Sequence, residues 1–107
     1  KDRSYLYSLA VSKNLWKRRM SMIATFHYFK DNDFKETIKI AQMLLKDEED
    51  LIHKAVGWAL REVGKRDLSI LESFLDKNCK VMPRTMLRYA IERMTEAKRK
   101  MYMRREE

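Results

Sequence analysis

Glycine and proline are almost absent from this chain, which has two glycines and one proline among 107 residues. Sheet proteins need turn residues wherever the chain reverses, so this scarcity predicts an all-helical protein with short connections. The hydrophobic content of 45% provides enough material for a core and excludes a disordered chain. A chain of this length is typical of one domain, and we expect a single helical-repeat domain over residues 1–107.

Capping residues and apolar periodicity divide the chain into six or seven helices. The candidate N-caps are Asn14, Asp33, Asp50 and Asp67. Pro83 suits the first turn of the sixth helix, and Gly64 is a candidate signal for the end of the fourth. The predicted helices span residues 4–11, 15–29, 34–46, 51–65, 68–78, 83–94 and 96–105.

Helices of this length with short linkers predict a HEAT-like array of antiparallel helical hairpins that forms a curved superhelix. The internal similarity between the hairpins is weak, so the prediction rests on helix length and spacing. An ordinary helical bundle remains the alternative.

The net charge of +8 is unevenly distributed, with +6 on residues 1–30, −4 on residues 31–53 and +6 on residues 54–107. This excess suggests a polyanionic partner, although simple solubility explains net charge equally well. Cys79 has no second cysteine with which to pair, so we expect a reduced, cytoplasmic setting. No apolar run approaches the roughly 18 residues of a membrane span, and we expect no membrane association.

Trp58 lies in the fourth helix, on the side away from that helix's apolar face. With Lys54 at zero on a helical wheel, Arg61, Lys65 and Trp58 fall within a stripe about 60° wide. One interpretation is that Trp58 packs against a neighbouring helix under the stems of these cations. The other is an aromatic platform in a basic groove, which suits nucleic acid because bases stack on the ring while the cations hold phosphates.

Arg19 raises the complementary question in the second helix, because it falls within a broad apolar arc that includes Trp16, Met20 and Ile23. An unpaired buried charge is costly, so Arg19 needs a partner. The partner is either one of the chain's acidic residues or an anionic ligand at the surface.

The remaining candidate functional residues are supported by weaker sequence signals. Arg84 and Arg88 lie one turn apart on the polar face of the sixth helix, an arrangement that is often merely solvated. His27 falls in the apolar arc and is expected in the core, and His27 and His53 lack the spacing of a metal site. We therefore expect no metal and no organic cofactor.

Three stretches together resemble the DNA alkylation repair family, the HEAT-like-repeat alkylpurine DNA glycosylases: "NLWKRRMSMIATF", "DLIHKAVGWALREVGKRD" and "MPRTMLRYAIERM". The resemblance implies a concave basic surface that holds double-stranded DNA containing alkylated purines, and hydrolysis of the N-glycosidic bond of N3- or N7-alkylated purines by a monomer. It implies that Arg19 is the active-site arginine and that Trp58 is an aromatic residue at the damaged nucleotide. The DNA-binding residues would be Lys54, Arg61, Lys65, Arg84 and Arg88.

Family members are about twice as long and carry an upstream motif of the form WDxVD, whose aspartate stabilises charge and positions water. This chain lacks that stretch, so we expect it to be the C-terminal part of such an enzyme and inactive alone. A non-catalytic module that binds nucleic acid and a scaffold for an acidic protein partner are the alternative functions.

Overall fold

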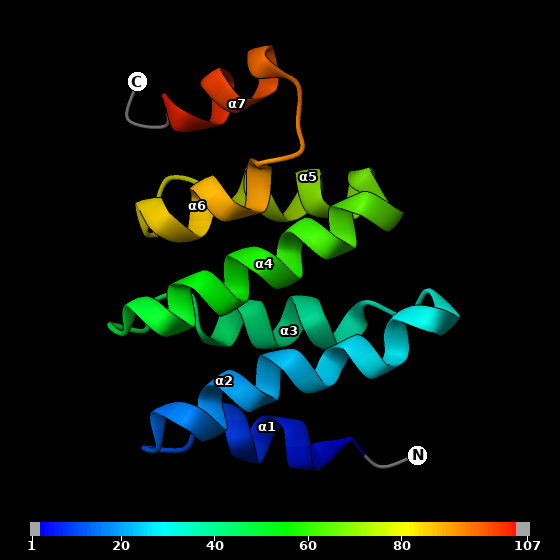
Figure 1. Ribbon diagram of the computed structural model, residues 1–107, viewed down its shortest axis with the longest axis vertical. Coiled ribbons are helices and arrows are strands. Elements are labelled where there is room, and N and C mark those ends of the chain that lie inside the picture. Colours follow the sequence, from blue (N-terminus) through cyan, green and yellow to red (C-terminus); the bar gives the residue numbers. More distant parts are fainter. Residues whose placement is uncertain (1–2, 105–107) are drawn as a thin grey trace.

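The computed structural model describes residues 3–104, and every regular element in this range is a helix, which confirms the all-helical prediction. Figure 1 shows consecutive helices stacked as antiparallel pairs, from the N-terminal end to the C-terminal end of the stack. The elements are α1 (Ser4–Ala10), α2 (Leu15–Ala24), the 3-10 helix η1 (Thr25–Asp31), α3 (Lys35–Met43), α4 (Asp50–Arg66), α5 (Leu68–Asn78), α6 (Arg84–Ile91) and α7 (Glu96–Met103).

The helices form two layers. The molecule measures 39 × 30 × 18 Å, and its smallest dimension accommodates two helices at the usual separation of about 8–10 Å. In one layer α2, α4 and α6 are neighbours and run in the same direction, while the odd-numbered helices run in the opposite direction (Figure 1). This regular alternation is the arrangement of a helical-repeat array. Among the described residues, no helix is both long and apolar enough to cross a membrane.

Apolar packing holds the even-numbered layer together, with α4 at its centre. Val56, Ala59 and Leu60 of α4 are fully buried, as are Met22 of α2 and Met86 of α6. These residues recur at helical spacing, so one side of each helix faces the core and the other is left for polar residues. The core side of α4 is therefore opposite the stripe that contains Trp58.

Polar side chains link neighbouring helices within the odd-numbered layer, and the first such links join the α1 region to the α3 region. Arg3 donates to Asp33 over 2.8 Å, and the Tyr7 hydroxyl donates to Glu36, which is buried. The guanidinium of Arg3 holds the pKa of Asp33 below its usual value. Burial, together with the hydrogen bond to Glu36, raises the pKa of Tyr7 to about 12, so its hydroxyl stays protonated as a donor.

Similar contacts continue along this layer. The amides of Gln42 in α3 and Asn78 in α5 exchange two hydrogen bonds of 3.1 Å. Tyr102 of α7 donates to Asp76 of α5 over 3.1 Å, and burial with this bond raises the pKa of Tyr102 to about 12. Each pair joins residues at least 26 positions apart in the chain, so sequence periodicity did not reveal them.

Gly57 allows α6 to approach α4 very closely. A Cβ atom added at Gly57 would lie 2.5 Å from Tyr89 Cβ and 2.6 Å from the Met86 carbonyl oxygen. Side chains do not fit at such distances, so a glycine here is required for the two helices to pack. The space beside Gly57 is filled by α6 and is not open to an approaching DNA strand.

The second predicted helix changes type before it ends. The α-helix stops at Ala24, and residues Thr25–Asp31 form a 3-10 helix instead of continuing as α-helix to Phe29. Side chains three residues apart eclipse one another in a 3-10 helix. Phe26 and Phe29 accordingly stack with their ring centroids 4.8 Å apart. Asn32 then ends the element in the left-handed conformation, with φ of 54°.

Two of the four predicted N-caps are confirmed, and Asp33 is wrong as an N-cap because Phe34 occupies that position while Asp33 pairs with Arg3. Asn14 accepts hydrogen bonds from Trp16 N and Lys17 N, and Asp67 accepts from Ser69 N, as predicted. Asp50 is wrong as an N-cap, because Glu49 occupies that position and the nearby Glu49 N–H donates to Asp47 instead.

Other predicted boundaries shift by a few residues. Gly64 does not end α4, which continues to Arg66; its missing side chain makes room for Leu71, whose Cδ2 would lie 2.5 Å from an added Cβ. The third helix covers Lys35–Met43, a shorter span than predicted, and the sixth begins after Pro83 and ends at Ile91. The predicted end of the last helix at Arg105 lies outside the described residues.

The two glycines of α4 provide a matched test of this packing. Gly57→Ala should destabilise the protein by about 1–3 kcal/mol, because the clash with the α6 backbone exceeds the gain of about 1 kcal/mol in helix propensity. Gly64→Ala should cost less, since the opposing atom is the end of a leucine side chain that can rotate. Urea unfolding measures both variants, and an equal or larger loss for Gly64→Ala would contradict this account.

Candidate nucleic-acid interface

The structure places the predicted stripe of α4 on the surface of the even-numbered layer. On one side of the stripe Gly57 contacts α6, and on the other Trp58 contacts Phe26 of η1. Lys54 and Lys65 are exposed and Arg61 is partly exposed. We call the surface formed by these three cations, Trp58 and the outward-facing residues of α2 and α6 the even-helix face.

Trp58 is only partly exposed, because its ring packs against Phe26 with the centroids 4.9 Å apart and the planes tilted by 59°. Phe26 also stacks on Phe29, so Trp58 belongs to an aromatic cluster between η1 and α4. Packing against a neighbouring helix is therefore part of the explanation for this residue. The same packing restricts the ring to one orientation while part of it stays accessible to solvent.

Each of the three predicted cations on α4 has a carboxylate partner. Lys54 pairs with Asp50 at 3.4 Å, and Lys65 pairs with Glu62 at 3.4 Å. Arg61 donates to Glu92, which follows α6, so this pair joins two neighbouring helices of the even-numbered layer. A phosphate that binds these cations has to compete with carboxylates, which lowers the net positive potential of the stripe.

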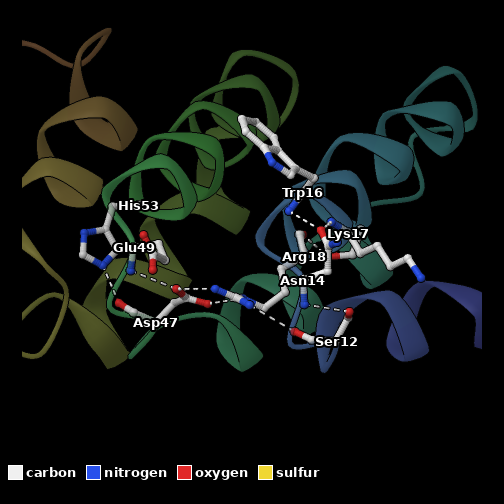
Figure 2. A network of polar contacts seen from close by, with 9 residues as sticks. Ser12, Asn14, Trp16, Lys17, Arg18, Asp47, Glu49 and His53 are labelled. Carbon is white, nitrogen blue, oxygen red and sulfur yellow. Dashed lines mark hydrogen bonds and ion pairs between the residues drawn. The ribbon is translucent and has the colours of Figure 1, made fainter.

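Arg18 belongs to a polar network at the start of α2 (Figure 2). Its Nε donates to Asp47 Oδ2 over 2.7 Å, and its Nη1 donates to the Ser12 carbonyl over 3.1 Å. The side chains of Arg18 and Asp47 are 16% and 9% exposed, so the pair is largely buried. The Asp47 carbonyl in turn accepts from Nε2 of His53 over 2.5 Å, which ties α2, the α3–α4 connection and α4 together.

The side chain of Arg19, next to it in the sequence, makes no hydrogen bond or ion pair with any residue in the range 3–104, although it is partly buried. Of the two alternatives for Arg19, an acidic partner is therefore not found among these residues, and Arg18 forms such a pair instead. Arg19 retains all five N–H donors for a ligand.

Trp16 and Met20 are exposed at 62% and 52%, so this part of the predicted apolar arc faces solvent where we expected the core. The buried side of α2 consists of Ser21 and Met22. The ring of Trp16 projects away from the Arg18–Asp47 network (Figure 2). An exposed indole beside a cation without a partner is the arrangement from which nucleic-acid platforms are built, and sequence reasoning did not identify Trp16 as a candidate.

Arg84 and Arg88 lie on the exposed side of α6, opposite Met86, Leu87 and Ala90. Neither arginine has an ion-pair partner within the described part of the chain. These two arginines and Arg19 therefore differ from the α4 cations, whose charges are balanced. The predicted site residues share one layer of the fold, but only those of α2 and α6 are free to bind an anion without breaking an existing contact.

Within residues 3–104, no group of three or more His, Cys, Asp or Glu side chains is placed to hold a metal ion. His27 is exposed, so its predicted place in the core is wrong. The 3-10 geometry of η1 is the cause, because it turns His27 outward while its neighbours Tyr28 and Phe29 are buried.

Arg18 and Arg19 form a matched pair for testing this assignment. Arg18→Ala leaves the largely buried carboxylate of Asp47 without its cation and should lower the free energy of unfolding by about 2 kcal/mol. Arg19→Ala should change it by less than about 0.5 kcal/mol, since no side-chain hydrogen bond or ion pair among the described residues is lost. Chemical denaturation of both variants measures the difference, and a reversed order would show that Arg19 has the structural role.

A family model described as DNA alkylation repair enzyme matches residues 1–94 of the chain. This range includes every residue of the predicted site on α2, α4 and α6. No curated protein and no solved structure matches the chain. The extent of the family match shows that the chain belongs to the DNA alkylation repair enzyme family.

Proposed function

We propose that this chain is part of a DNA glycosylase that releases N3- and N7-alkylated purines from double-stranded DNA, and that the even-helix face supplies part of the DNA-binding surface of that enzyme. The observation that carries the proposal is Arg19, a partly buried guanidinium without a partner among the described residues, in a chain that belongs to a DNA alkylation repair family. A protein normally pairs such a group, so an anionic ligand is the expected partner.

The reaction hydrolyses the bond between C1′ of the deoxyribose and N9 of the purine. Alkylation makes the purine cationic and a good leaving group, so the bond breaks with its electron pair going to the base. Water then adds its oxygen to C1′ and loses a proton, which leaves an abasic site. The main catalytic requirement is stabilisation of positive charge on the sugar and correct placement of the DNA backbone.

The residues of the even-helix face suit two parts of this task. The planar guanidinium of Arg19 fits a phosphate oxygen pair next to the lesion. The ring face of Trp58, held in place by Phe26, is attractive to a cationic purine or to the developing charge on the sugar. Arg84 and Arg88 supply further phosphate contacts on α6, while Lys54, Arg61 and Lys65 contact phosphates after displacement of their carboxylates.

Base release by the full-length protein is the direct test. Duplex DNA containing 7-methylguanine or 3-methyladenine should release the free base, measured by chromatography. Arg19→Ala and Trp58→Ala should lower the rate by about 100-fold, the usual scale for loss of one transition-state contact. Lys46→Ala, an exposed cation outside the even-numbered layer, is the control and should leave the rate unchanged. Lesion binding without release would instead support a non-catalytic nucleic-acid-binding module.

Salt dependence tests the binding surface independently of catalysis. If about five phosphates are contacted, the slope of log affinity against log salt concentration should be about −4 to −5. Fluorescence anisotropy with an undamaged duplex measures this slope. A flat response would favour the alternative of a scaffold for a protein partner.

A further inference from the structure

A cavity of about 240 Å³ opens beside the even-helix face, where α4 and α6 end and the chain turns into α7. Arg61 and Lys65 of α4 line it, together with Arg93 and Lys98 from the end of the chain. None of its lining residues is acidic. The cavity therefore presents four cations to whatever enters it, and it shares two of them with the proposed DNA-binding surface.

The interior of the cavity is apolar. Leu71, Ala90 and Met94 are buried along its walls, and Leu68 is exposed at 43%. Gly64 also lines it, and Leu71 packs against this glycine and forms part of the wall. An apolar interior with a cationic rim suits a ligand that combines a compact nonpolar body with an anionic group.

The rim charges are only partly balanced. Arg61 pairs with Glu92, Lys65 with Glu62 and Lys98 with Glu72, but the three carboxylates lie outside the lining of the cavity. Arg93 is exposed and has no hydrogen bond or ion pair with any residue in the described range. An anion in the cavity therefore finds at least one guanidinium whose N–H donors are all available.

Building on the proposed function, we propose that this cavity binds one sugar–phosphate unit of the DNA backbone away from the lesion. The phosphate contacts Arg93 and Lys98 at the rim, and the carbon face of the deoxyribose packs on Leu68 and Met94. A cationic alkylated purine gains no attraction from the unpaired guanidinium of Arg93, so the rim favours the backbone phosphate over the damaged base. The family match ends at Met94, so Lys98 and α7 add this contact from outside the matched residues.

Arg93→Ala in the full-length protein tests the proposal, with Lys46→Ala as a control that removes the same charge elsewhere. Arg93→Ala should make the slope of log affinity against log salt concentration shallower by about 0.9, because one phosphate contact is lost. The control Lys46→Ala loses no such contact, so its slope should equal that of the wild type. Because the side chain of Arg93 makes no hydrogen bond or ion pair within the described residues, folding should be unaffected, and circular dichroism checks this.

Neutral methylphosphonate substitutions, made one at a time along an undamaged duplex, identify the phosphate. One position should weaken binding of the wild type while causing no further loss in Arg93→Ala, because the contact is already absent there. If no such position exists, or if Arg93→Ala and Lys46→Ala behave alike, the proposal is overturned while base release by the wild type still supports the glycosylase function. Failure of the wild type to bind DNA at all would overturn both.

Discussion

The close contact between α4 and α6 at Gly57 determines which part of this molecule is available for function. Because the α6 backbone occupies the space of a side chain at Gly57, α6 is fixed against one edge of α4. The aromatic contact between Trp58 and Phe26 fixes α2 and η1 against the other edge. The strip of α4 between these two contacts is left at the surface, and it carries Lys54, Arg61 and Lys65. Packing thus decides the face on which the charges appear.

The two layers of the array are stabilised by different forces, and this difference bears on function. Helices of the even-numbered layer pack mainly through apolar side chains, whereas α1, α3, α5 and α7 are linked by pairs such as Gln42–Asn78 and Tyr102–Asp76. The Arg61–Glu92 pair and the network of Arg18 and Asp47 also join α2, α4 and α6, but they do not involve the outward-facing Arg19 and Arg88. Uncommitted charges of this kind on one surface attract a polyanion.

Sequence reasoning was accurate for α4 and only partly accurate for the second predicted helix, and the contrast has a simple physical basis. A helical wheel shows which residues share a face but not what that face meets. In α4 the apolar side was long and met the core, so the position of Trp58 on the opposite side followed from periodicity. In the second predicted helix the apolar arc is divided: Met22 is buried and Phe26 packs against the core, whereas Trp16 and Met20 face solvent. The acidic partner that was one alternative for Arg19 pairs with Arg18.

By itself, the sequence determined the helical class, the caps at Asn14 and Asp67, and the set of residues that share each face. These properties depend on neighbours within about four positions, where hydrogen-bond geometry is the same in every helix. Only the tertiary structure decided that Asp47 forms an ion pair with Arg18, that Glu92 forms one with Arg61, and that α6 fills the space beside Gly57. Each of these choices joins residues about 30 positions apart. Such pairings depend on how whole helices stack, and local periodicity contains no information about that.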